Sequence, residues 1–270
     1  MTAVKKHSDP LSLNTNNKKT GKKRLDLLLV ERNLVQSRER AKAVIMAGQV
    51  MVDDLMIDKA GTPVATDAQI ILRGEDIPFV SRGGLKLDHA IRHLNLTVKG
   101  LVCLDIGAST GGFTDCLLKN GAAFVHAVDV GYGQLDWSLR QDPRVDVIER
   151  TNIRYMDFDR IGRTVDLVTV DTSFISLKIV VPAAEKFMHK DTRVLALIKP
   201  QFEAGKSRVG KGGVVRDPKV REEIIQEISE FFTLRGYVTG EVIPSPVPGP
   251  KGNLEFIISL RYSEDICNKV

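Results

Sequence analysis

Four charged side chains that could carry out acid–base chemistry stand at the expected ends of separate structural elements. Asp171 and Lys199 each follow directly on an apolar run that is typical of a buried strand. Because open α/β sheets bind ligands at the carboxyl ends of their strands, both should face one crevice. Lys86 opens a helical pattern that leads into the first strand, and Glu255 precedes the last one. If that last strand is antiparallel to the others, all four side chains converge.

Two lysines and two carboxylates suit methyl transfer to a ribose 2′-hydroxyl, a poor acid that must be positioned and deprotonated. Nearby cations and burial can lower the pKa of a lysine until it serves as a base, and Lys199 is our candidate. Asp171 and Glu255 would orient the two ammonium groups, and alignment would supply much of the rate. The alternative is that each residue is half of an unrelated surface ion pair.

A glycine-rich turn follows the first expected strand of the sheet. Its pattern, acid-x-Gly-x-x-x-Gly, runs from Asp105 to Gly111. The dinucleotide signature Gly-x-Gly-x-x-Gly fails because Ser109 stands at its second glycine. The turn instead resembles the motif that binds S-adenosyl-L-methionine (SAM) in methyltransferases. An ordinary glycine-rich turn between strand and helix is the alternative.

Asp129 closes the second expected strand, where a carboxylate can accept both ribose hydroxyls of an adenosine cofactor. It does not by itself separate SAM from NAD. Asn152, after the next strand, is a candidate for the adenine edge. The candidate cofactor residues are Asp105, Gly107, Ala108, Ser109, Thr110, Gly111, Gly112, Phe113, Asp129, Val130, Asn152 and Asp171.

Several other chemistries are disfavoured by the same sequence. Residues 205–207 read Gly-Lys-Ser, but a P-loop would need glycine at position 200, which is proline. Methylation of exocyclic amines typically uses Asn/Asp-Pro-Pro-aromatic, whereas residues 171–174 read Asp-Thr-Ser-Phe. None of the three cysteines is expected at the crevice, as carbon methylation of cytosine would require. Because they are far apart and form no CxxC pair, we expect no metal site.

The elements that position these residues alternate between strands and helices after residue 100. Strands are expected at 101–106, 124–130, 145–148, 165–170, 194–198, 238–242 and 256–260. Helices are expected at 85–94, 112–119, 177–187 and 218–234. This alternation predicts an α/β fold with a mostly parallel sheet and helices on both faces. Before it lies a smaller α+β unit, with helices near 25–33 and 40–48 and strands near 50–52 and 70–72.

The net charge of +5 is unevenly distributed. Residues 1–24 contain seven basic side chains and one acid, so residues 25–270 sum to −1. Nucleic-acid binding must therefore rest on local patches, since overall charge does not support it. The loop 205–221, with six basic residues and one acid, is expected to close over RNA. The candidate RNA-binding residues are Arg38, Arg40, Lys42, Arg82, Lys206, Arg208 and Lys211. Solvated surface charge is the alternative for each.

Five segments together resemble a known enzyme family. They are residues 80–87, 105–113, 171–177, 198–203 and 252–256, and their sequences are similar to those of the TlyA family, FtsJ-like ribosomal RNA (rRNA) 2′-O-methyltransferases. Residues 24–53 resemble the RNA-binding domain of the ribosomal-protein-S-four type, although residues 52–54 read Val-Asp-Asp where that domain often has glycine at the third place. Family members also carry an old haemolysin label.

The resemblance implies a Rossmann-like SAM methyltransferase with a mostly parallel seven-stranded sheet, preceded by a small α+β RNA-binding domain. It implies a catalytic tetrad of Lys86, Asp171, Lys199 and Glu255, with SAM as cofactor. It also implies 2′-O-methylation of cytidine in rRNA of the small subunit, the large subunit or both, with ribosomal particles as partners.

We predict a disordered arm over 1–23, an RNA-binding domain over 24–78, a linker over 79–83 and a methyltransferase domain over 84–263. With no secretory signal and no apolar run near the ~18 residues that span a bilayer, a cytoplasmic protein that does not bind membranes is expected. Two alternatives stay open: a membrane-active haemolysin, and a ribosome-binding factor without catalytic activity.

Overall fold

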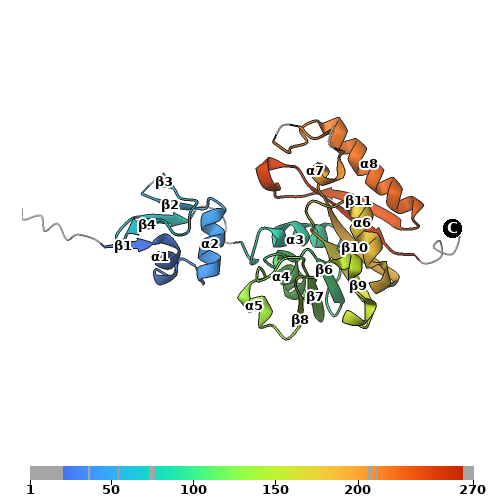
Figure 1. Ribbon diagram of the computed structural model, residues 1–270, viewed down its shortest axis with the longest axis horizontal. Helices are drawn as coiled ribbons and strands as arrows, with labels where there is room; N and C mark the ends of the chain where they lie inside the picture. The colour runs from blue at the N-terminus through green and yellow to red at the C-terminus, as the bar shows by residue number, and fades with distance from the viewer. Residues whose placement is uncertain are drawn as a thin grey trace, which may run out of the picture. The chain divides into compact units, whose positions relative to one another are not determined.

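The chain folds into two compact units, Met1–Glu75 and Asp76–Val270 (Figure 1). The computed structural model describes residues 21–35, 37–53, 55–72, 77–205, 208–210 and 212–263. Each unit has its own apolar core and is considered separately.

The first unit is the expected small α+β unit. Its elements are β1 (Lys22–Arg24), α1 (Leu25–Glu31), α2 (Arg38–Met46), β2 (Val50–Val52), β3 (Leu55–Met56), β4 (Pro63–Ala65) and β5 (Ile70–Leu72). Strands β3, β2 and β5 form one antiparallel sheet, and β1 pairs with β4. Ser37 caps α2 by accepting a hydrogen bond from the Arg40 amide. Buried residues such as Leu25, Leu29 and Ile45 join the two helices to the sheet.

One sequence expectation about this unit needs correction. Lys22 and Lys23 were assigned to the disordered arm, but they lie in β1, because their backbone pairs with β4. Residues 1–20 of the predicted arm lie outside the described residues. Asp53 adopts a left-handed conformation at φ 47°, and its carboxylate accepts a hydrogen bond from the Gln69 amide. Aspartate tolerates this conformation. Asp54, which stands where the resembled domain often has glycine, lies outside the described residues.

The second unit confirms the expected α/β architecture. Its strands are β6 (Val102–Ile106), β7 (Phe124–Val128), β8 (Val145–Ile148), β9 (Val165–Val170), β10 (Met188–Ile198), β11 (Val238–Pro244) and β12 (Phe256–Arg261). Its α-helices are α3 (Gly83–His93), α4 (Gly112–Lys119), α5 (Trp137–Arg140), α6 (Leu177–Ala184), α7 (Pro200–Glu203) and α8 (Pro218–Leu234). The seven strands form one sheet in the order β11-β12-β10-β9-β6-β7-β8. Among these strands β12 runs antiparallel to both its neighbours, and the other pairings are parallel.

Helices cover both faces of this sheet (Figure 1). On one face α6 and α8 bury Val181, Ile228 and Phe232. On the other, α3 and α4 bury Leu87 and Leu117. Burying each such side chain contributes roughly 1.5–3 kcal/mol, so the strands form a rigid support for the loops at their carboxyl ends.

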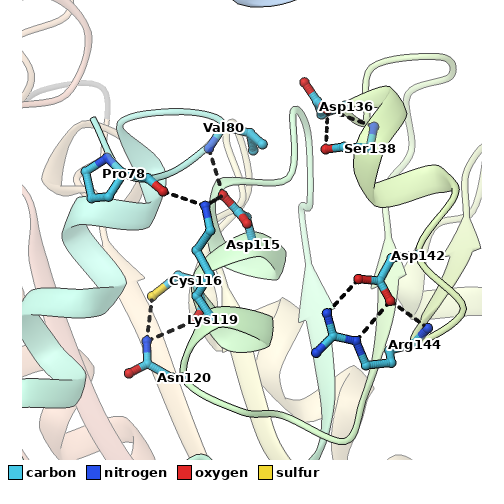
Figure 2. A network of polar contacts seen from close by, with 10 residues as sticks. All are labelled: Pro78, Val80, Asp115, Cys116, Lys119, Asn120, Asp136, Ser138, Asp142 and Arg144. Carbon is cyan, nitrogen blue, oxygen red and sulfur yellow. Dashed lines mark hydrogen bonds and ion pairs between the residues drawn. The ribbon is translucent and has the colours of Figure 1, made fainter. Parts of the chain in front are cut away.

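Residues 79–83, predicted to be a linker, are packed into the second unit. Phe79 is buried in the core beside α3, where a Cβ on Gly84 would overlap its ring. The Val80 amide donates to the Asp115 carboxylate at 2.9 Å, and Lys119 reaches both Asp115 and the Pro78 carbonyl (Figure 2). The segment is therefore fastened to α4, a contact that no local sequence pattern reveals.

Candidate active site

A cavity of about 310 Å³ opens at the carboxyl edge of the large sheet. Its walls come from the start of α3, the glycine-rich turn after β6, the loop after β9, the end of β10 and the segment 247–255. The four predicted catalytic side chains, Lys86, Asp171, Lys199 and Glu255, all line it. Parallel strands and one antiparallel strand thus bring together residues that are far apart in the sequence.

Lys86 and Glu255 form a buried ion pair at one side of the cavity. Lys86 Nζ donates to Glu255 Oε2 at 2.6 Å, and the two side chains are 10% and 0% exposed. Glu255 precedes β12, whose antiparallel direction places its first residue at the carboxyl edge. Backbone packs against this carboxylate, because a Cβ on Gly249 would overlap Glu255 Oε1. That oxygen is buried and has no hydrogen-bond partner among the described residues.

Lys199 and Asp171 form a second pair across the same cavity. Lys199 Nζ lies 2.5 Å from Asp171 Oδ1 at an angle outside hydrogen-bonding geometry, and it donates to Ser173 Oγ at 3.1 Å. The Asp171 amide donates to the Ile106 carbonyl at 3.0 Å, which ties this loop to the end of β6. The Lys199 amine therefore stands between a carboxylate and a hydroxyl at the cavity wall.

The glycine-rich turn is shaped by close backbone approaches. At Gly107, with φ 85°, a Cβ would lie 2.6 Å from the Asp171 carbonyl oxygen. At Gly111, with φ 94°, a Cβ would overlap Leu139. Side chains at these positions would push the turn away from the neighbouring loops. The predicted residues of this turn that line the cavity are Gly107, Ala108, Ser109, Thr110, Gly112 and Phe113.

Asp105 has a different place from the one expected of a cofactor ligand. Its side chain is fully buried, and its two oxygens accept hydrogen bonds from Thr114 Oγ1 at 2.7 Å and Thr169 Oγ1 at 2.9 Å. Burial raises the pKa of this carboxyl to about 6. Asp105 therefore braces the turn from below and does not line the cavity.

The remaining predicted cofactor residues follow β7 and β8. Asp129 is half-buried, and its oxygens accept hydrogen bonds from the Ser109 and Gly131 amides, each at 2.7 Å. Val130 is exposed, and the Asn152 side chain accepts from the Arg154 amide to cap a short 3₁₀ helix. None of the three lines the 310 Å³ cavity in the described part of the chain. Asp129 nevertheless contacts the glycine-rich turn, because it accepts a hydrogen bond from the amide of Ser109, which lines the cavity.

This arrangement fits the cofactor that the sequence implies. Asp171 Oδ1 is buried beside the cavity and accepts no hydrogen bond from any described residue. Asp129 keeps lone pairs for further donors beyond the two amides it already serves. A ligand with ribose hydroxyls and a cationic centre matches these carboxylate acceptors.

The predicted RNA-binding residues divide into paired and exposed groups. Arg208 is held by both oxygens of Glu227 on α8, at 2.6 and 3.0 Å. Arg38 donates a hydrogen bond to the Asp26 carboxylate. Hydrogen bonds from Arg24 and Arg38 keep the pKa of Asp26 below its usual range. Both arginines thus pair with acids of this chain, whereas the sequence predicted that they contact RNA phosphates.

Lys42 and Arg82 are exposed, and Arg82 lines the cavity at the start of α3. The Arg40 side chain is partly buried. Lys206 and Lys211 lie outside the described residues. In the same basic segment the structure leaves Arg216 and Lys219 exposed, while Arg221 donates to the carbonyls of residues 215 and 216.

Sequence reasoning missed two features beside Lys199. Phe174 is 88% exposed at φ 64° and packs against Phe202 at 4.8 Å between ring centroids. Glu203 accepts hydrogen bonds from Ser176 Oγ and the Leu177 amide. An aromatic residue with an exposed ring and a left-handed backbone is unusual, but neither the exposure nor the backbone conformation can be seen in the sequence. The available signal was the position of both residues next to predicted catalytic segments.

Two further observations concern other classes of function. No helix in the described ranges is long and apolar enough to cross a lipid bilayer. Within those same ranges, no group of three or more His, Cys, Asp or Glu is arranged to hold a metal ion.

Comparison with known proteins matches both units. Residues 79–262 match the FtsJ-like methyltransferase family, and residues 23–70 match the S4 domain. The chain is 46% identical to "Putative rRNA methyltransferase YqxC" of Bacillus subtilis, over 89% of this chain and 86% of that protein. It is 47% identical to "16S/23S rRNA (cytidine-2′-O)-methyltransferase TlyA" of Mycobacterium tuberculosis, over 90% and 91%. A solved structure, "Putative hemolysin from Streptococcus thermophilus", shares 40% identity over 92% of each chain, with a TM-score of 0.72.

Proposed function

Because the chain belongs to the TlyA family of FtsJ-like methyltransferases, we propose that it uses SAM to methylate cytidine 2′-hydroxyls in rRNA. The observation that carries this proposal is the cavity with its two Lys–carboxylate pairs. An RNA-binding S4 domain on the same chain supports RNA as the substrate. The rRNA and the cytidine are those of the similar M. tuberculosis protein.

In the proposed binding mode, the turn from Gly107 to Phe113 would receive the methionine end of SAM. Asp129 would accept hydrogen bonds from the ribose hydroxyls, and Asn152 and Val130 would hold the adenine. Asp105 acts indirectly, because its carboxyl is hydrogen-bonded to Thr114 and Thr169 below the turn. Bound SAM would supply a methyl group from its sulfonium, and the departure of a neutral thioether makes the transfer favourable.

The protein then has to align and deprotonate the acceptor. Lys199 Nζ, as the proposed base, would accept the proton of the 2′-hydroxyl when the methyl group is transferred. Asp171 and Ser173 hold the Lys199 amine in place, at 2.5 and 3.1 Å. The Lys86 ammonium, fixed by Glu255, faces the same cavity and can hydrogen-bond the acceptor oxygen as it becomes negative. Preorganised charges of this kind act most strongly where water is excluded.

The second unit carries exposed groups suited to single-stranded RNA. Phe174 is an exposed ring that directly follows Ser173, a residue of the cavity wall, and aromatic rings stack on unpaired bases. Arg82, Arg216 and Lys219 are exposed cations of the same unit that could contact phosphates. In the first unit Lys42 offers a similar charge. We propose ribosomal particles as the partner, and therefore the cytoplasm as the place of action.

The experiment is transfer of a radiolabelled methyl group from SAM to purified ribosomal subunits. Wild type should label the rRNA, and Lys199→Ala should abolish labelling while calorimetry still detects SAM binding. Lys186→Ala is the matched control, because Lys186 is an exposed lysine that does not line the cavity. Full activity of Lys199→Ala would contradict the assignment of the base. Absence of labelling by wild type on every rRNA substrate would contradict the function.

A further inference from the structure

The carboxylate of Glu203 bridges the two loops that carry Asp171 and Lys199. Glu203 is the last residue of α7. Its Oε2 accepts a hydrogen bond from Ser176 Oγ at 2.6 Å, and its Oε1 accepts one from the Leu177 amide at 2.8 Å. Both donors belong to the start of α6, directly after the loop that begins with Asp171.

The other end of this bridge is connected directly to Lys199. Lys199 caps α7, and its carbonyl accepts hydrogen bonds from the Phe202 amide at 2.8 Å and the Glu203 amide at 3.3 Å. A single turn of backbone therefore separates the Glu203 carboxylate from the catalytic lysine. The packing of Phe174 against Phe202 is a second contact between the same two loops.

Glu203 also supplies the acceptors for two partly buried donors. The Leu177 amide is one of the first N–H groups of α6, which have no acceptor within the helix. Ser176 Oγ itself accepts from the Lys178 amide, so its hydroxyl proton is left to donate to Glu203. Burial raises the pKa of Glu203, while these hydrogen bonds and the nearby Lys178 ammonium act in the opposite direction. Removing the carboxylate would leave two partly buried donors without this acceptor, a change that favours movement of the loop.

We propose that Glu203 is a positioning residue that holds the Lys199 amine against Asp171 and Ser173 by locking the two loops together. This inference rests on the proposed function, because it assigns Lys199 as the base. Glu203 does not line the cavity, so it acts through the loops and not on the substrate. Its removal should impair the chemical step and leave cofactor binding intact.

The test compares Glu203→Ala, Glu203→Gln and Glu203→Asp with wild type in the methyl-transfer assay. Because displacement of a catalytic group by about 1 Å can cost roughly 10²-fold in rate, Glu203→Ala should lower kcat by about that factor. Gln can accept from the Leu177 amide and donate to Ser176, so its kcat should stay within about threefold of wild type. Asp keeps the charge but shortens the reach by about 1.5 Å, so an intermediate loss is expected.

Three further readouts separate positioning from a merely structural role. KM for rRNA and the Kd for SAM should be unchanged in Glu203→Ala, because its contacts lie behind the cavity wall. The acid limb of the kcat–pH profile should shift, because Lys199 loses its fixed place beside Asp171 and opposite the Lys86–Glu255 pair. A variant with a lower Tm but wild-type kcat and an unshifted profile would overturn the proposal.

The outcome can also be separated from failure of the proposed function. If wild type methylates rRNA and Lys199→Ala does not, but all three Glu203 variants retain full kcat, only the positioning role is refuted. If Glu203→Ala does not fold, Glu203→Asp and Ser176→Ala decide the question with the same measurements. Ser176→Ala removes one of the two donors and should lower kcat less than Glu203→Ala does. A wild-type kcat in both Ser176→Ala and Glu203→Asp would refute the positioning role of Glu203.

Discussion

The buried pair of Lys86 and Glu255 should make the second unit sensitive to the removal of either partner, because the remaining charge would be buried without compensation. Glu255→Ala leaves the Lys86 ammonium, 10% exposed, without its carboxylate 2.6 Å away. Breaking a buried pair in this way typically costs about 3–5 kcal/mol. With a urea slope of about 2–3 kcal/mol per molar for a unit of this size, the unfolding midpoint should fall by roughly 1–2 M.

Tryptophan fluorescence can follow this transition, because Trp137 is the one tryptophan of the chain and lies in the second unit. Arg92→Ala is a matched control on the same helix as Lys86. Arg92 is 78% exposed and paired with Asp88, and such surface pairs contribute about 0.2–1 kcal/mol. Its midpoint should therefore stay close to that of wild type.

A double variant separates stability from catalysis. Lys86→Met with Glu255→Leu removes both charges at similar volume, a replacement that is often neutral or stabilising by about 1–4 kcal/mol. Its midpoint should return to the wild-type range while methyl transfer stays lost. If Glu255→Ala shifts the midpoint no more than Arg92→Ala does, the pair is not desolvated and the reasoning is refuted.

Variants of the cofactor turn and the basic segment test the remaining assignments. A Cβ at Gly107 would lie 2.6 Å from the Asp171 carbonyl at φ 85°, so Gly107→Ala should weaken SAM binding; equal calorimetric affinity would contradict this. The pKa of Asp105 is about 6 in the folded state, above its usual value of 3.8. The protonated Asp105 carboxyl therefore contributes fully to the stability of the fold below about pH 4, and this contribution is lost as the pH rises through 6. Asp105→Asn should remove that pH dependence, about 3 kcal/mol, from urea titrations, and an unchanged dependence would argue against it. Arg208→Ala should leave the salt dependence of RNA binding unchanged, because Glu227 holds the Arg208 side chain. Arg216→Ala should lower the slope of log K against log salt concentration by about one. A lower slope with Arg208→Ala and an unchanged slope with Arg216→Ala would contradict this assignment.

Much of the large sheet could be predicted because its strands are apolar and its connections regular. Strands β8 and β9 have their expected bounds, and β6 differs by one residue. The prediction for β10 missed residues 188–193, which include His189, Lys190 and Asp191 and interrupt the apolar pattern. The pairing of β10 with β9 also shifts register there, between Met188 and Arg193.

The convergence of the four catalytic candidates was predictable because topology alone places strand ends at one edge. Side-chain partners were not predictable in the same way. Arg38 and Arg208 read as free cations in the sequence, but each pairs with an acid that only folding brings near, Asp26 and Glu227. Likewise, the role of Asp105 depends on hydroxyls from two other elements, which its local motif does not specify.

The most direct measurement of the central claim is nucleoside analysis of rRNA after reaction with the purified protein and SAM. The rRNA is digested to nucleosides, which are separated and identified by mass spectrometry, with Lys199→Ala run in parallel. The account predicts new 2′-O-methylcytidine with wild type and none with the variant. A methyl group on the base, or 2′-O-methylcytidine formed equally by Lys199→Ala, would contradict it.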